Sequence, residues 1–132
     1  MRIACFTFDN PSVVGALLRA RTRGVEVKLM FSHRDRGMTR NQESRLQQIR
    51  AAGGHVRGLD TPRLHAKWML ADATLIVGST NFTEASLSNV ERAAVVTGLS
   101  PAQLASEASW YDRLFDGEPA FTAGIGARTP GR

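Results

Sequence analysis

The first thirty residues combine two hydrophobic patterns, and this combination restricts the fold more than any other feature of the chain. Residues 3–8 form a short apolar run rich in aromatic side chains, which predicts a buried strand. Asp9-Asn10-Pro11 is a helix-start signal, and apolar residues then recur at helical spacing until Gly24. Residues 25–31 predict a second strand. Strand, helix and strand within about thirty residues form a βαβ unit, whose strands lie parallel with a right-handed crossover.

The remaining pattern predicts a small α/β domain. A second helix is expected from Thr39 to about residue 52, and a third begins at Ser100-Pro101. Further strands are expected at residues 55–59, 66–71, 74–78 and 93–97. We therefore expect a mixed, mostly parallel sheet flanked by helices, in one domain over residues 1–116. Residues 117–132 are rich in Gly, Pro and Ala without periodicity, which predicts a flexible tail.

Composition excludes several classes of protein. Cys5 is the only cysteine, so neither an internal disulfide framework nor a cysteine-rich zinc site is available. No apolar run approaches the roughly 18–20 residues of a transmembrane helix. We expect a reducing, intracellular setting. The compartment stays open between the cytoplasm and, if the full-length protein carries an anchor, the mitochondrial surface.

Positive charge is unevenly distributed along the chain. The net charge is +5, and residues 19–63 hold eleven Lys and Arg against four Asp and Glu. Such a basic segment suits a polyanionic partner, which is either nucleic acid or anionic phospholipid. An ordinary solvated, arginine-rich surface is the alternative interpretation.

The hairpin predicted over residues 66–78 brings polar side chains together at its open end. Side chains two apart in a strand share a face, so His65 lies beside Lys67 and Ser79 beside Asn81. Folding back at Asp72, which we interpret as a turn former, brings the two pairs together. Lys67 supplies charge, Ser79 and Asn81 supply directional donors, and an imidazole can attack or transfer protons. The pattern predicts an anion site with a nucleophile.

The spacing H-x-K-x4-D followed by G-S-x-N resembles the signature of the phospholipase D superfamily. The matching residues are His65, Lys67, Asp72, Gly78, Ser79 and Asn81. Five residues separate Asp72 from Gly78 where the family has six, which indicates a shorter hairpin turn. Asn89-x-Glu91 and the segment 110–113 extend the likeness to the small single-motif members over about residues 3–117. These members are the bacterial Nuc-type endonucleases and the mitochondrial cardiolipin hydrolase (Zucchini) group.

The resemblance implies a role for each residue of the motif. His65 would attack phosphorus and form a phosphohistidine, while a second motif histidine protonates the leaving oxygen. Lys67 would act in catalysis and, with Ser79 and Asn81, bind the phosphate oxygens. Glu91 would orient the imidazole. Asp72 and Gly78 would be structural, and the family's chemistry needs neither a metal nor another cofactor.

The family pattern also bears on assembly and on the start of the chain. One motif per chain implies a homodimer, because the chemistry needs two histidines. Family members normally have a helix and part of a strand before the segment that begins here at Met1. We therefore expect this chain to lack the family's N-terminal helix.

Three functions follow, in order of preference. The first is a phosphodiesterase that acts as a nuclease, because no membrane anchor and no Zucchini-type zinc cysteines are visible. The second is a hydrolase of cardiolipin or a related phospholipid. The third is a non-catalytic nucleic-acid-binding module with a vestigial site, against which the complete set of motif residues argues.

Overall fold

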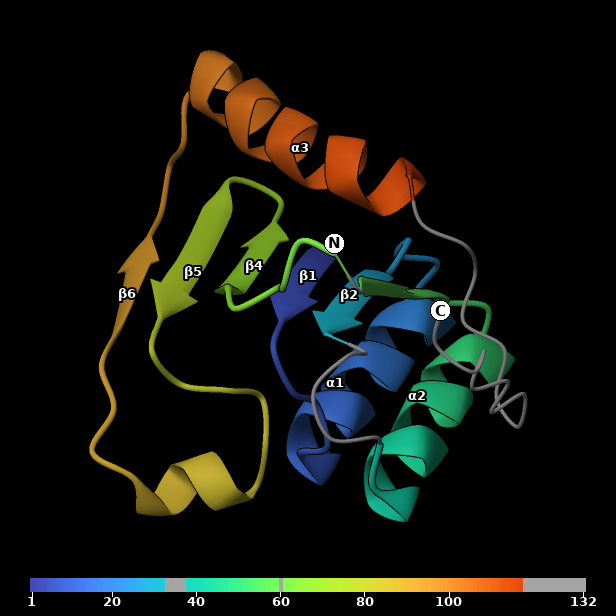
Figure 1. The fold of residues 1–132 in the computed structure, drawn as a ribbon. Coiled ribbons are helices and arrows are strands. Elements are labelled where there is room, and N and C mark those ends of the chain that lie inside the picture. Colours follow the sequence, from blue (N-terminus) through green and yellow to red (C-terminus); the bar gives the residue numbers. More distant parts are fainter. Residues whose placement is uncertain (33–37, 60, 118–132) are drawn as a thin grey trace, which may run out of the picture.

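The computed structural model describes residues 1–32, 38–59 and 61–117, so the tail predicted over 117–132 lies almost wholly outside the described residues. Figure 1 shows the arrangement of its helices and strands. In chain order these are β1 (Arg2–Cys5), α1 (Pro11–Thr22), β2 (Lys28–Ser32), α2 (Arg40–Ala51), β3 (His55–Leu59), β4 (Lys67–Ala71), β5 (Thr74–Gly78), the 3₁₀ turn η1 (Ala85–Ser88), β6 (Ala93–Val96) and α3 (Pro101–Asp116). None of the described helices is both long and apolar enough to cross a membrane.

The strands form one mixed sheet in the order β3-β2-β1-β4-β5-β6. β1 pairs with β2 and β2 with β3 in parallel, so the predicted βαβ unit and the α/β class are confirmed. The balance of directions differs from the expected mostly parallel sheet, because the β1–β4, β4–β5 and β5–β6 pairs are antiparallel. Parallel pairing needs a long crossover, whereas β4 and β5 are joined by a two-residue turn that permits only an antiparallel pair.

Helices cover the sheet on both faces, as Figure 1 shows. Alternate strand residues such as Ile3 and Leu29 pack with α1 and α2, and Ala4, Met30 and Trp68 pack with α3. The α3 side is held by stacked rings, with Tyr111 lying 5.5 Å from Trp68 and 5.4 Å from Phe115 between centroids. The strands that carry the motif are thus anchored from both sides.

Two predicted strands are shorter than their hydrophobic runs. The N–H of Val25 still bonds to the carbonyl of Ala20 at the end of α1, so β2 begins only at Lys28. β1 ends at Cys5, and beyond it Phe8 makes an isolated parallel bridge with Phe82. This bridge fixes the loop that follows β5 against the start of α1.

β6 forms one edge of the sheet and is exposed along its whole length. Val95 is 63% exposed and Val96 is 43% exposed. β6 pairs with β5 alone, so its outer backbone groups face away from the sheet.

Candidate active site

His65 and Lys67 lie where β4 begins, beside the carboxyl end of β1. Lys67 is the first residue of β4 and pairs with Cys5, the last residue of β1. Leu64 is buried and fixes the chain just before His65, whose side chain is exposed. The imidazole is therefore presented to solvent from a rigid sheet end, where a substrate can reach it.

The Lys67 ammonium lies directly against His65. Its Nζ donates to the His65 carbonyl oxygen at 2.8 Å and lies 3.2 Å from Nδ1 and 3.3 Å from Nε2 of the imidazole. The lone-pair directions of the two ring nitrogens diverge, so one ammonium cannot align with both. The contact places a positive charge next to both ring nitrogens.

Phe6 forms an aromatic floor under this pair. Its ring centroid lies 5.1 Å from that of His65, with the rings tilted by 48°. Lys67 Nζ lies 5.5 Å from the same centroid and Arg63 Cζ lies 4.9 Å from it, which are cation–π distances. Sequence reasoning placed Phe6 inside a buried strand and so missed its place beside His65. The early end of β1 is the cause, and only the structure reveals it.

Ser79 and Glu91 form the second half of the site. The Ser79 hydroxyl donates a short hydrogen bond to a Glu91 carboxylate oxygen and accepts from the Arg92 N–H at 3.1 Å. The other Glu91 oxygen accepts from Asn89 Nδ2 at 3.2 Å. The hydrogen bond from Ser79, followed by that from Asn89, holds the pKa of Glu91 below its ordinary value. Glu91 is therefore a carboxylate throughout the neutral range.

Charge connects the two halves of the site. Burial lowers the pKa of the Lys67 ammonium. The negative charge of Glu91 raises this pKa, and the positive charge of Arg63 lowers it further. Among the described residues no hydrogen bond or ion pair joins Glu91 to His65. The predicted role of Glu91 in orienting the imidazole therefore stays a prediction, and in this single chain Glu91 holds Ser79 and Asn89 instead.

Gly78 is needed because two backbones meet there. A Cβ at this position would lie 2.5 Å from the Arg92 carbonyl oxygen and 2.7 Å from Ala93 Cα. The close approach lets the Ser79 N–H donate to the Arg92 carbonyl at 3.0 Å. Gly78 thus controls the position of Ser79 relative to Glu91.

Asp72 and Asn81 have different surroundings from those of the other motif residues. Asp72 has φ +50° in the turn between β4 and β5, at the end of the hairpin away from His65, where it acts as the predicted turn former. Asn81 follows β5, and its Oδ1 atom is buried without a hydrogen bond to any described residue. Asp72 therefore shapes the hairpin, and among the described residues no hydrogen bond joins Asn81 to His65, Lys67 or Ser79.

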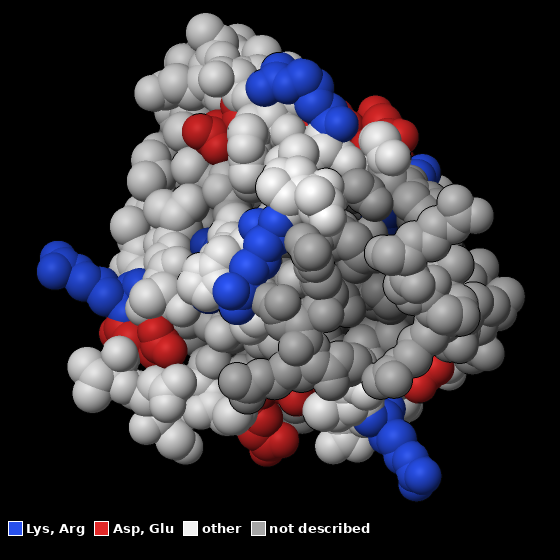
Figure 2. All heavy atoms as spheres, in the orientation of Figure 1, with Lys and Arg blue, Asp and Glu red and all other residues white. Residues whose placement is uncertain are grey.

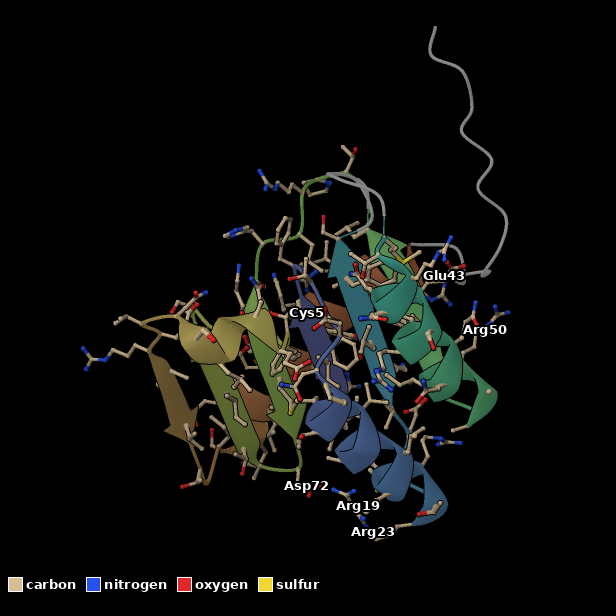
Figure 3. All side chains as sticks on the ribbon, turned by 90° about the horizontal axis from the view of Figure 1, so that it is seen from below. Cys5, Arg19, Arg23, Glu43, Arg50 and Asp72 are labelled. Carbon is tan, nitrogen blue, oxygen red and sulfur yellow. The ribbon has the colours of Figure 1, made fainter. Side chains whose placement is uncertain are left out.

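The basic side chains labelled on α1 in Figure 3 lie away from the site. Figure 3 shows Arg19 and Arg23 toward the same end of the molecule as Asp72, because α1 runs back along the sheet. Figure 2 shows Lys and Arg side chains apart from one another on the face that it presents, and acidic side chains mostly toward its rim. Arg63 and Lys67 are the basic residues that contact the His65 cluster through Phe6.

The described residues contain no group of three or more His, Cys, Asp or Glu that could hold a metal ion. His55, the other histidine within the described part, begins β3 and lies 4.0 Å from Glu26. In the sheet, β3 is separated from β4 by β2 and β1. His55 is exposed and therefore belongs to the surface.

Comparisons with known proteins identify the family and agree with the fold. Residues 1–116 match the family described as "Cardiolipin synthase, PLD-like domain". The chain is similar to Nuc, a phospholipase D family member from Salmonella typhimurium, with a TM-score of 0.81 and 26% identity over 91% of this chain and 80% of Nuc. NucT from Helicobacter pylori is similar in fold, with a TM-score of 0.70 and 15% identity over 91% of this chain and 80% of NucT. A search of curated proteins found no match.

Proposed function

Because the chain belongs to the cardiolipin synthase, PLD-like domain family and is a phosphodiester hydrolase of the phospholipase D superfamily, we propose that it is a nuclease that works through a phosphohistidine on His65. One observation carries the assignment to His65. Its exposed imidazole is held at a sheet end with the Lys67 ammonium 3.2 and 3.3 Å from its two ring nitrogens. A nucleophile and the charge that draws a phosphate to it thus lie together.

The proposed reaction has two balanced steps. A neutral ring nitrogen of His65 attacks phosphorus, so that a P–N bond forms while the P–O bond to the leaving strand breaks. The leaving oxygen takes a proton from His65 of a second copy of the chain. Water then attacks phosphorus, the P–N bond breaks, and the second His65 takes up the proton that the water releases.

The other residues would stabilise the charge on phosphorus. Lys67 would face the non-bridging oxygens, and Ser79 and Asn81 would donate to them. The Ser79 hydroxyl donates to Glu91 in the free protein, so it would exchange this partner for the phosphate when substrate binds. Glu91 would then be free to act on the imidazole, as the family resemblance implies.

A homodimer completes this proposal. The mechanism needs two histidines, and each chain contributes one motif. The buried Asn81 Oδ1 supports a site that is incomplete in one chain, because an unsatisfied buried acceptor costs about 1–3 kcal/mol. A donor from a second chain would satisfy it, whereas the phosphate, which carries only acceptor oxygens, would not.

Nucleic acid is the substrate that we favour, and cardiolipin is the second candidate. A net charge of +5 and the two cations around Phe6 suit a polyanionic strand. The family description names cardiolipin synthase, which keeps an anionic phospholipid as the alternative.

A parallel assay tests the proposal. Purified protein is incubated with single-stranded DNA, RNA and cardiolipin vesicles in buffer containing EDTA, and products are quantified. We expect strand cleavage that EDTA does not abolish, and loss of turnover in His65→Asn with unchanged folding. His55→Asn is the matched control and should keep full activity, since His55 is exposed and lies outside the site.

The same assay can contradict each part of the proposal. Hydrolysis of cardiolipin without strand cleavage would refute the nuclease assignment and leave the family's chemistry intact. Residual turnover in His65→Asn, or an absence of an alkali-stable, acid-labile phosphoprotein after rapid quenching of the wild type, would refute the phosphohistidine.

A further inference from the structure

A groove of about 530 Å³ lies next to the site, on the face of the sheet that α3 covers. One wall is formed by β4 and β5, and the other by α3, which Figure 1 shows crossing over these strands. Lys67 and Gly78 line the groove and also belong to the site. The groove therefore adjoins the strand end that carries the site.

Two indole rings give this groove an aromatic wall. Trp68 and Trp110 both line it, and their rings meet edge to face with centroids 5.3 Å apart and an angle of 61°. Trp68 is buried beneath α3, whereas Trp110 is only partly buried. Trp110 therefore offers ring surface to a flat, aromatic ligand, and such stacking is the usual way to bind an unpaired base.

Glu107 adds a fixed acceptor to the same wall. One of its carboxylate oxygens accepts from the Trp68 indole N–H at 2.9 Å, which orients the group at the groove. The second oxygen can accept a hydrogen bond from a ligand. A carboxylate here disfavours a second phosphate by repulsion and an acyl chain by desolvation, but suits a ring that carries N–H donors.

We propose that this groove is a nucleobase subsite of the enzyme, in which the base beside the scissile phosphate stacks on Trp110 and donates to Glu107. The inference rests on the proposed nuclease function and specifies its substrate. Cytosine, adenine and guanine present amino donors to a carboxylate. Thymine flanks its single ring N–H with two carbonyl oxygens, so it should bind less well.

Cleavage of matched single strands tests the subsite. The substrates are an oligodeoxycytidylate, an oligothymidylate and an abasic strand of equal length, and kcat and KM are measured for each. The wild type should favour the cytidylate over the abasic strand by about tenfold in kcat/KM, mainly through KM. Trp110→Leu should remove this advantage and leave cleavage of the abasic strand unchanged, whereas Trp110→Phe should retain most of it.

Glu107→Gln tests the acceptor separately and keeps the hydrogen bond from Trp68. Its amide can donate to thymine carbonyls, so the preference for cytidylate over thymidylate should fall or reverse. Glu84→Gln is the matched control, because Glu84 is exposed near η1 and does not line the groove. Since Trp110 packs against the α3 core, thermal unfolding of each variant is compared, and Glu107→Gln decides the matter if Trp110→Leu does not fold.

The outcomes separate this inference from the proposed function. Equal cleavage of the cytidylate, thymidylate and abasic strands by the wild type would overturn the subsite and leave the nuclease standing. Cleavage of no strand by the wild type would overturn both. If Trp110→Leu slows hydrolysis of cardiolipin vesicles but not of strands, the groove binds lipid and the inference is wrong.

Discussion

Lys67 is the basic residue of the site whose pKa the structure shifts. Burial lowers the pKa of its ammonium below the ordinary lysine value, so Lys67 becomes neutral at a lower pH than an exposed lysine does. We predict that kcat/KM falls as pH rises, beginning below about 10.4, the reference pKa of lysine. A bound phosphate raises the pKa again, so kcat alone should fall only at higher pH. Steady-state rates measured between neutral pH and about pH 10.4 provide the test.

Lys67→Arg separates this effect from other alkaline changes. A guanidinium stays protonated throughout that range, so the variant's alkaline decline should be smaller than that of the wild type, whatever its absolute rate. An identical decline in both proteins would mean that another group, and not Lys67, titrates there.

Among the elements, the β5–β6 pair has the tightest steric constraint. Gly78→Ala would bring a Cβ against the backbone of Arg92 and Ala93, so one strand must move. We predict a loss of about 1–3 kcal/mol in the free energy of unfolding. Activity should fall by more than the loss of stability explains. Ser79 directly follows β5 and Glu91 lies just before β6, so movement of either strand would disturb their hydrogen bond. Chemical denaturation and steady-state kinetics of the same preparation measure both effects.

Gly15→Ala in α1 is the contrasting substitution. A Cβ there meets only the flexible end of Arg19 at 3.3 Å, and alanine favours a helix interior by about 1 kcal/mol over glycine. This variant should be at least as stable as the wild type and fully active. If Gly78→Ala behaves in the same way, the close approach does not constrain the site.

Local pattern was sufficient to predict most elements and the contact between His65 and Lys67. Helix caps, the Asp72 turn and the spacing of His65 and Lys67 are properties of neighbouring residues, and β3 and β5 have the predicted bounds. The direction of strand pairing, the place of Phe6 and the partners of Glu91 depend on contacts between distant segments. No periodicity encodes those contacts, so they became visible only in the structure.

At the scale of the whole molecule, we predict a two-fold dimer with the two His65 side chains facing each other. Light scattering at micromolar concentration should report twice the chain mass. Excess His65→Asn chain mixed with wild type should lower activity beyond simple dilution, because each mixed dimer contains only one His65. A strict monomer, or wild-type activity that the inactive chain leaves unchanged, would contradict the shared site.

The exposed edge of β6 affects how this protein behaves at high concentration. Strand edges without lysine, proline or a covering element invite pairing with another chain. In the part of the chain that the structure describes, β6 presents Val95 and Val96 without lysine, proline or a covering element. Association through this edge would pair the β6 strands of different chains and favour aggregation. It would be independent of the predicted dimer, in which the two His65 side chains face each other. A gatekeeper charge such as Val95→Lys would improve solubility, and it would leave dimerisation at the site as the association that light scattering detects.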